Sequence, residues 1–172
     1  MGVKGNAILG LITLADFIGC GLMAQAQESQ VDYDGFVELS AEISDYRSSR
    51  LVDLDTFNEM KAESGTIVLD TRSAEAFRMG HIDGAVHLNF SEFTDDKLAK
   101  VIPSKDTRIL IYCNNNFTDN VAPVPVKRIE LALNVPTFIN LYGYGYENIY
   151  ELDGAYPTAE PAIQWVGEAS PL

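Results

Sequence analysis

The sequence predicts an α/β fold built around a mainly parallel sheet. Apolar runs of strand length, such as residues 66–70 and 108–112, lack polar alternation, which is typical of strands buried on both faces. Segments with helical signals separate these runs, as in successive βαβ units. A cysteine and an asparagine-rich turn then follow residues 108–112 directly, so Cys113 stands where a buried strand is expected to surface.

Cys113 is the first candidate for a functional residue. In an open parallel sheet, ligands bind at the carboxyl ends of the strands, so a thiol at this point is placed for chemistry. The alternative is a small apolar residue that completes the core, since free cysteines are usually buried and inert. Position alone leaves both interpretations open.

Length and charge limit the possible function. A chain of 172 residues suits one domain with additional segments. The formal net charge of −13 argues against binding to nucleic acid or to an anionic membrane surface, both of which attract basic patches. A polyanionic substrate would need a local basic pocket.

Residues 1–26 have the features of a signal peptide. Lys4 precedes an apolar stretch at residues 7–15, and Ala24-Gln25-Ala26 is a cleavage signature that places the cut before Gln27. The apolar stretch is too short and interrupted for a membrane span. A second interpretation is a lipoprotein box at residues 17–20, with a lipid anchor on Cys20. Both interpretations place the mature protein outside the cytoplasm, in the periplasm, secreted or anchored as a lipoprotein.

The cysteine content supports a reactive thiol. The chain has two cysteines, Cys20 and Cys113. Removal of the leader leaves Cys113 without an internal disulfide partner in an oxidising compartment. A single cysteine there implies intermolecular pairing or a reactive thiol.

The first half of the chain predicts alternating elements. Residues 27–49 form a polar N-terminal extension with a short helix near residues 36–46. The domain proper covers residues 50–157 and begins with a strand at 50–52. A helix capped by Asp55 or Thr56 ends at Gly65, and a strand follows at 66–70. Ser73 caps a short helix that Gly80 ends.

The second half continues the pattern. A strand at 85–88 and a helix at 93–102 precede the strand that ends at Cys113. A helix at 137–142 and a last strand at 148–152 follow. Residues 158–172 form a C-terminal tail, in which Trp165 is expected to pack back on the domain. His81, His87 and Cys113 lack the close spacing of metal ligands, so we expect no metal site.

A set of ordered motifs resembles the rhodanese homology domain family. These motifs are residues 70–77 (DTRSAEAF), residues 80–85 (GHIDGA), the strand ending at Cys113 and residues 145–154 (GYENIYELDG). The resemblance implies a single rhodanese-like domain with a five-stranded parallel sheet and helices on both faces. It also implies that Cys113 is the catalytic cysteine and that no cofactor is needed.

The resemblance assigns roles to further residues. Backbone N–H groups around Cys113 would lower the pKa of its thiol, so that the thiolate accepts a sulfane sulfur as a persulfide. Asp70 would accept N–H groups of its loop, and Arg72 would pair with Glu75 or another buried acid. His81 would be a hydrogen-bonded hinge. A catalytic pair of His81 with Cys113 is the alternative.

The sequence departs from the family after the cysteine. Residues of about 114–134 form an insert before the next helix, and the resemblance assigns the start of this insert to a substrate or anion loop. The loop residues are Asn114, Asn115, Asn116 and Phe117, with no cation among them. The apolar composition of the insert predicts a lid over the Cys113 pocket. Lys127 and Arg128 are its only cations, and one of them is expected to supply positive charge to the site.

The leading hypothesis is therefore an exported sulfurtransferase or sulfur carrier that uses a Cys113 persulfide. Its partners would be a small sulfur-containing donor and a thiol acceptor. The departure after the cysteine argues against thiosulfate as the donor. Phosphatase relatives of the family have an arginine near the cysteine, and none stands near Cys113 in this sequence. The competing hypothesis is a binding or redox-sensing module that has lost turnover, with a thiol pKa near the ordinary value.

Overall fold

The structure, a computed structural model, describes residues 1–2 and 28–168. The cleavage signature and Cys20 lie outside the described residues. Residues 28–32, in the first of two units of the chain, have no helix or strand, and the second unit begins at Tyr33. Within the described residues, no helix has the length and apolar character needed to cross a bilayer.

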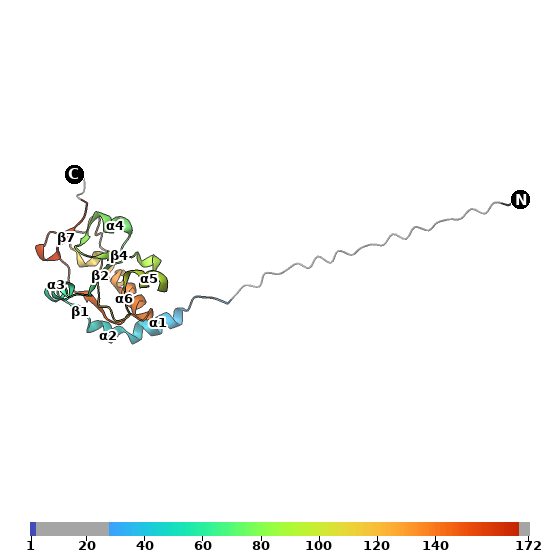
Figure 1. Cartoon of the computed structure of the whole chain (residues 1–172), viewed down its shortest axis with the longest axis horizontal. Helices are drawn as coiled ribbons and strands as arrows, with labels where there is room; N and C mark the ends of the chain where they lie inside the picture. The colour runs from blue at the N-terminus through green and yellow to red at the C-terminus, as the bar shows by residue number, and fades with distance from the viewer. Residues whose placement is uncertain (3–27, 169–172) are drawn as a thin grey trace. The chain divides into compact units, whose positions relative to one another are not determined.

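A five-stranded parallel sheet forms the centre of the second unit (Figure 1). The strand order is β1 (Leu51–Val52), β6 (Ile149–Leu152), β5 (Ile109–Tyr112), β2 (Ile67–Asp70) and β4 (Val86–His87). The central strand β5 is buried along its whole length, as its unbroken apolar sequence predicts. The predicted sheet is confirmed.

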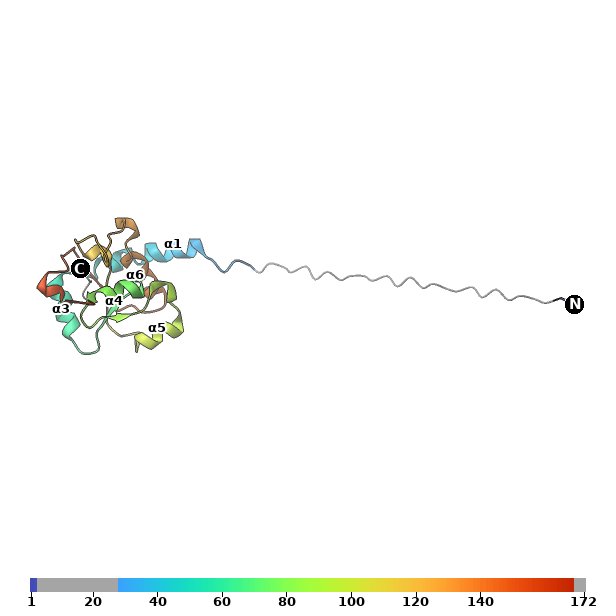
Figure 2. The same ribbon diagram turned by 90° about the horizontal axis from the view of Figure 1, so that it is seen from above.

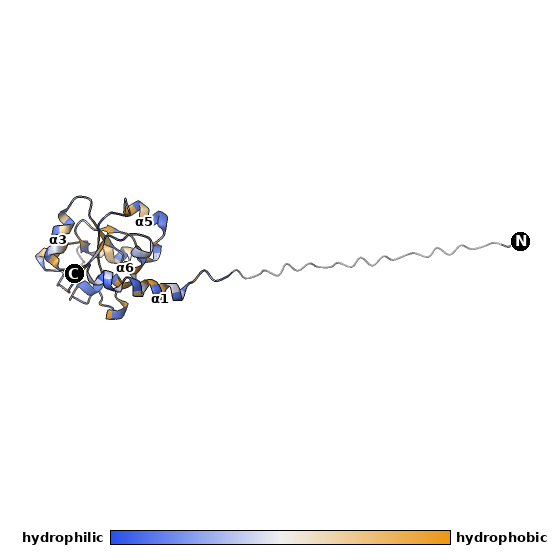
Figure 3. Ribbon diagram, turned by 90° about the horizontal axis from the view of Figure 1, so that it is seen from below, coloured by the Kyte–Doolittle hydropathy of each residue, from blue (hydrophilic) through white to orange (hydrophobic). Residues whose placement is uncertain are grey.

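Helices cover one face of the sheet through a continuous apolar cluster. Ile109 and Ile111 of β5 point to this face, where they pack with side chains of α5 and α6 and with the connection between α1 and α2. The helices are α1 (Tyr33–Glu42), α2 (Ser44–Ser48), α5 (Asp95–Val101) and α6 (Asn134–Gly143). Figure 2 shows α1, α5 and α6 from above, and Figure 3 shows polar and apolar residues interspersed along α1 and α5.

The opposite face of the sheet carries a second apolar cluster. Leu110 and Tyr112 of β5 point there and pack with Leu54 and Phe57 of α3. The elements on or near this side are α3 (Leu54–Ala62), α4 (Ala74–Met79), β3 (His81–Ile82), η4 (Pro161–Ile163) and β7 (Trp165–Val166). Helices therefore cover both faces, as predicted.

Two helix boundaries differ from the prediction. Asp53, not Asp55 or Thr56, caps α3 by accepting the N–H of Thr56 at 2.8 Å. The single helix expected near residues 36–46 is divided into α1 and α2 around Ile43, which is 2% exposed and belongs to the first cluster. Ser73 caps α4 through the N–H of Ala76, and Gly80 follows its end, as predicted.

The C-terminal segment packs on the domain through Trp165, as predicted. Its ring makes an edge contact with Phe117 at a centroid distance of 4.8 Å. Trp165 also covers Gly80 so closely that a Cβ there would lie 2.4 Å from the indole nitrogen. The antiparallel pairing of β7 with β3, which brings Trp165 opposite Ile82, was not predicted from the sequence.

The segment after Cys113 holds only short 3-10 turns before α6. These are η2 (Asn114–Asn116) and η3 (Ile129–Leu131), while η1 (Phe90–Glu92) lies earlier in the chain. Val124 is 1% exposed and belongs to the second apolar cluster, so the insert is anchored in the core at its middle. α6 begins at Asn134, earlier than the predicted 137.

Candidate active site

Cys113 follows the last residue of β5 and precedes η2. Its side chain is 1% exposed, and it has no disulfide partner among the described residues. The backbone N–H of Cys113 donates to Oδ1 of Asn116 at 2.8 Å, and Nδ2 of Asn116 donates to the carbonyls of Leu152 and Gly154. Asn116 therefore fixes the cysteine loop against the end of β6.

The start of α6 returns to the cysteine after residues 114–133. Backbone N–H groups of Asn115, Asn134 and Leu133 interact with the Cys113 sulfur, and each lowers the pKa of its thiol. Such a set of donors, next to the positive end of a helix, favours an anion. The insert thus preserves the contact between sulfur and helix start that the family resemblance implies.

Burial raises the pKa of the Cys113 thiol by more than these N–H groups lower it. Desolvation is the largest influence on Cys113 and raises the pKa of its thiol, and the Glu151 carboxylate raises that pKa further. The net pKa lies above the ordinary value, in contrast to the lowered value that the resemblance implies. The physical reason is that the sulfur is almost fully buried and the neighbouring charge is negative.

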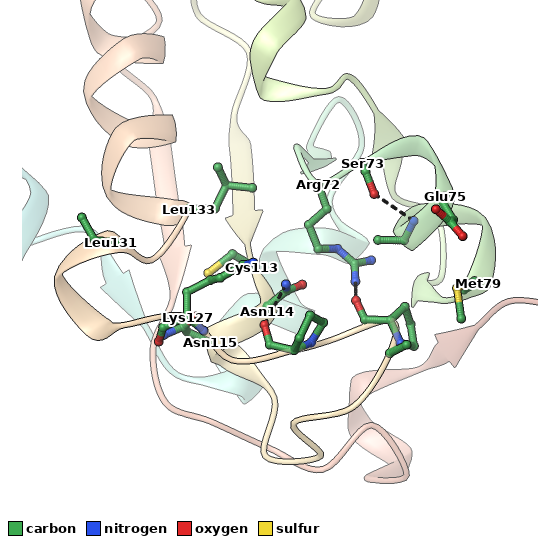
Figure 4. A pocket seen from close by; sticks show the side chains of 14 residues that line it. Arg72, Ser73, Glu75, Met79, Cys113, Asn114, Asn115, Lys127, Leu131 and Leu133 are labelled. Carbon is green, nitrogen blue, oxygen red and sulfur yellow. Dashed lines mark hydrogen bonds between the residues drawn. The ribbon is translucent and has the colours of Figure 1, made fainter.

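A cavity of about 500 Å³ opens beside Cys113, and we call it the insert cavity. Figure 4 shows Cys113 between Leu131 and Leu133 on one side and Arg72, Ser73, Glu75 and Met79 on the other. The wall of the insert cavity also includes Ala76, Asn114, Asn115, Ala122, Pro123, Pro125 and Lys127. A site of this size accommodates a small organic molecule.

Two of the asparagines hold the insert against the cysteine loop. Nδ2 of Asn114 donates to the carbonyl of Pro125 at 3.0 Å. Asn115 makes a two-point contact with Lys127, since its Nδ2 donates to the Lys127 carbonyl and its Oδ1 accepts the Lys127 N–H. The asparagine run thus fixes the wall of the insert cavity, a role that its sequence did not reveal.

The other three residues that the sequence assigned to the loop, Phe117, Lys127 and Arg128, lie in three different places: the core, the wall of the insert cavity and the surface outside it. Lys127 lines the insert cavity, whereas Arg128 is exposed and is not part of its wall. Phe117 is 1% exposed and packs between Tyr112 and Trp165, so it belongs to the core rather than to the cavity. Both cations are exposed, and Lys127 is the one that shares the wall of the insert cavity with Cys113.

Asp70 and Arg72 form a buried ion pair beside the insert cavity. Asp70 is 0% and Arg72 3% exposed, and their closest atoms, Oδ2 and Nη2, are 2.6 Å apart. The sequence left the partner of Arg72 open, and the structure identifies Asp70 rather than Glu75. Tyr112 donates its hydroxyl to Asp70 at 2.6 Å, and burial followed by the Asp70 charge raises the pKa of Tyr112.

The guanidinium of Arg72 also holds two segments together. Nη2 donates to the carbonyl of Gly80 at 2.6 Å and Nη1 to that of Pro123 at 3.3 Å. The second contact reaches the insert and is drawn in Figure 4. Because its donors are directed to protein oxygens, Arg72 acts here as a scaffold residue.

The two histidines lie away from the sulfur. Nδ1 of His81 is 2.7 Å from the carbonyl oxygen of Phe77, and its ring stacks on Phe77 at 3.8 Å. Nε2 of His87 is 2.8 Å from the carbonyl oxygen of Arg72. Neither residue is in the wall of the insert cavity. Residues 28–168 hold no cluster of three His, Cys, Asp or Glu side chains suited to a metal ion.

A second cavity, of about 320 Å³, also has Cys113 in its wall, and we call it the polar cavity. Its polar side chains come from Arg47, Asn115, Asn116, Asn134, Glu151 and Asp153. Sequence reasoning assigned no role to Arg47, Asn134 or Glu151. Glu151 offered one signal, because it is a charged residue inside the otherwise apolar or aromatic strand 149–152.

The sequence of the chain matches the model of a known protein family. The model of the family described as "Rhodanese-like domain" matches residues 53–158. The chain belongs to this family. The match includes the rhodanese-like motifs and Cys113, while α1, α2 and Trp165 lie outside it.

Curated relatives of this rhodanese-like protein have two kinds of name. Two are tRNA uridine(34) hydroxylases, from Bdellovibrio bacteriovorus and Bradyrhizobium diazoefficiens. Each is 30% identical, over 63% and 68% of this chain but only 28% and 43% of the relative. The third is the thiosulfate sulfurtransferase GlpE of Pseudomonas putida, 27% identical over 57% of this chain and 73% of the relative. The chain thus spans less than half the length of the hydroxylases.

Two solved structures resemble the chain at low sequence identity. The Alr3790 protein from Anabaena sp. is 18% identical, with a TM-score of 0.46, over 67% of this chain and 91% of that one. The BH2092 protein from Bacillus halodurans is 21% identical, with a TM-score of 0.43, over 69% of this chain and 77% of that one.

Proposed function

We propose that this protein is a sulfurtransferase or sulfur carrier in which Cys113 holds a persulfide. The observation that carries the proposal is the position of the Cys113 sulfur, next to three backbone N–H groups and in the wall of the insert cavity. The N–H groups stabilise a thiolate or a persulfide anion, and the cavity supplies room for a donor. The name of the Pseudomonas putida relative supports the same class of reaction.

The proposed first step is a displacement on sulfur. Cys113 loses its proton, and the thiolate attacks the outer sulfur of a donor R–S–S⁻. The S–S bond of the donor breaks, and R–S⁻ leaves with the electron pair and takes up the proton that Cys113 lost. Cys113–S–S⁻ remains. A thiol acceptor then removes the outer sulfur and regenerates Cys113, so the cycle is redox-neutral and needs no cofactor.

The insert cavity favours an organic donor over a small dianion. Ala76, Met79, Leu131 and Leu133 give it an apolar wall. Lys127 adds a cation to that wall, while the Arg72 guanidinium is directed to Asp70, Gly80 and Pro123. We therefore propose a persulfide of a small organic thiol as the donor.

Intact mass measurement tests the loading step. Full-length protein with Cys20→Ser, which leaves Cys113 as its thiol, is incubated with organic persulfides and with thiosulfate. The expected result is a gain of about 32 Da, one sulfur atom, that an added Cys113→Ser substitution abolishes. A chain that gains no sulfur from any donor, while a control rhodanese does, contradicts the proposal.

A second candidate is a redox-sensing or binding module. The observation that favours a loss of turnover is the raised pKa of the buried Cys113 thiol, since cysteines that transfer sulfur usually have lowered pKa values. This candidate gives a reversibly oxidised Cys113 and no sulfur transfer. The loading experiment separates the two functions.

We also propose that the protein is exported, on the basis of residues 1–26. The mature protein would then begin at Gln27. N-terminal sequencing of protein from its native cells tests this, and a lipid-modified Cys20 would instead support the lipoprotein alternative. Contacts with RNA are not part of the proposal, because a net charge of −13 opposes binding to phosphate groups.

A further inference from the structure

Cys113 belongs to the walls of two cavities. The insert cavity lies between α4 and the insert, whereas the polar cavity lies between the insert, α2, the start of α6 and the end of β6. Cys113 and Asn115 belong to both walls. A donor in one cavity therefore leaves the other available for the acceptor.

Glu151 is the buried carboxylate of the polar cavity. Its side chain is 8% exposed, and Arg47 of α2 binds it through Nε and Nη2 at 2.8 and 2.7 Å. Nδ2 of Asn134 donates to Glu151 at 3.2 Å and to Asn116 at 3.0 Å, and Asn116 in turn accepts the N–H of Cys113. A continuous hydrogen-bonded chain thus joins Glu151 to the cysteine loop.

The surroundings of Glu151 suit a proton acceptor. Burial raises the pKa of Glu151, and Arg47 lowers it. A carboxylate with a raised pKa is a stronger base, and Arg47 keeps it charged until a proton arrives. Arg47 lies outside the matched residues 53–158, so this feature depends on the N-terminal helices.

We propose that the polar cavity binds the acceptor thiol and that Glu151 takes its proton. This inference rests on the proposed sulfur transfer. Glu151 removes the proton of R–SH, and R–S⁻ attacks the outer sulfur of Cys113–S–S⁻. The bond between the two Cys113 sulfurs breaks, the Cys113 thiolate leaves with the electron pair, and Glu151 returns the proton to it. The products are R–S–S⁻ and Cys113–SH, so atoms and charge balance.

The charges of the polar cavity select the class of acceptor. Its ionisable side chains besides Cys113 are Arg47, Glu151 and Asp153, which give a net negative charge. Arg47 is already paired with Glu151, whereas Asp153 is exposed and uses Oδ1 to accept the N–H of Gly154. A thiol that carries an amine is therefore the preferred acceptor, and Asp153 is its counter-ion.

A discharge assay tests the inference. Full-length protein with Cys20→Ser is loaded with sulfur, its mass is checked, and the loss of the added sulfur is timed with cysteamine, 2-mercaptoethanol or mercaptoacetate. We expect cysteamine to react fastest and mercaptoacetate slowest. Asp153→Asn should reduce this difference, whereas Glu130→Gln, an exposed acid of the insert outside both cavities, should preserve it.

Glu151→Gln gives the decisive signature. The glutamine keeps an oxygen for Asn134, so the loop retains its contact. Discharge to every thiol should slow by about 100-fold, a typical loss for a general base. Alkylation of unloaded Cys113 should become faster at neutral pH, because removal of the Glu151 charge lowers the thiol pKa. A merely structural residue would not change the two rates in opposite directions.

The outcomes distinguish this inference from the proposed function. A protein that never gains sulfur contradicts both. A protein that gains sulfur but discharges it equally fast before and after the Glu151→Gln substitution contradicts the role of Glu151 alone. Equal discharge rates for the three thiols contradict the acceptor class. The expected order of the thiols, together with slow discharge in Glu151→Gln, supports the whole inference.

Discussion

Two neighbouring strands of the sheet end in very different polar sites. β2 ends at Asp70, whose carboxylate is buried and bound by Arg72 and Tyr112. β5 ends just before Cys113, whose sulfur meets backbone N–H groups and an opposing carboxylate. The first site belongs to the family motif, and the second is completed by the insert and the N-terminal helices. The family motif therefore supplies a buried scaffold, while the insert and the N-terminal helices supply the polar surroundings of Cys113.

The largest expected effect tests the scaffold. Arg72→Met leaves the Asp70 carboxylate buried without its cation, which should lower the free energy of unfolding by about 3–5 kcal/mol. Urea denaturation measures the loss. Lys97→Met, which removes the exposed pair with Glu92, should cost about 0–1 kcal/mol. Similar losses in both variants would show that the buried pair of Asp70 and Arg72 contributes no more to the free energy of unfolding than an exposed pair does.

The double variant Asp70→Asn/Arg72→Met sharpens this test. It removes both charges, so no uncompensated ion remains in the core, and part of the lost stability should return. The amide oxygen of the new side chain should still accept the hydroxyl of Tyr112. A double variant that is less stable than Arg72→Met alone would contradict the explanation that the uncompensated charge of Asp70 destabilises the single variant.

The intermediate effect concerns the insert. Asn115→Ala removes two hydrogen bonds to Lys127, each worth about 1 kcal/mol, and should loosen the wall of the insert cavity. Alkylation of Cys113 by a bulky reagent should accelerate by about tenfold, because the sulfur is 1% exposed in the closed structure. Asn148→Ala, which removes a hydrogen bond to Asp106 far from the site, is the control. Equal rates in both variants would show that the insert does not limit access.

The smallest effect concerns the two insert cations. Lys127→Ala should slow sulfur loading from an anionic donor by about two- to fivefold, the size of one exposed charge interaction. Arg128→Ala should leave the rate unchanged, since Arg128 is not in the wall of the insert cavity. A rate assay with a neutral polysulfide, which neither substitution should affect, controls for misfolding. A loading rate that falls only in Arg128→Ala would show that Arg128, and not Lys127, acts on the donor.

Much of the fold followed from the sequence because its signals are local. Unbroken apolar runs predicted β2 and β5, Ser73 and Gly80 marked the ends of α4, and Cys113 followed its strand as expected. The sequence did not predict the division of α1 from α2 or the pairing of β3 with β7. Both depend on distant contacts, such as those of Ile43 and Trp165 in the two apolar clusters.

The site was only partly predictable for the same reason. The sequence pointed to Cys113 and offered Lys127 and Arg128 as equal candidates for a nearby cation. It could not show that Arg47 pairs with Glu151, which lies about a hundred residues further along the chain. The asparagine run predicts an anion loop, and its role in holding the insert follows only from the partners Pro125 and Lys127. Phe117 is adjacent to this loop in sequence, although its ring faces the core.

The pH dependence of Cys113 alkylation tests the central claim most directly. The claim is that burial and Glu151 outweigh the N–H groups of Asn115, Leu133 and Asn134, so that Cys113 is a protonated thiol at neutral pH. The rate follows the thiolate fraction, and it should rise with pH to a midpoint above the ordinary cysteine value of about 8.5 in protein with Cys20→Ser. A midpoint below that value would contradict the claim and would mean that the helix start and the loop N–H groups control the sulfur.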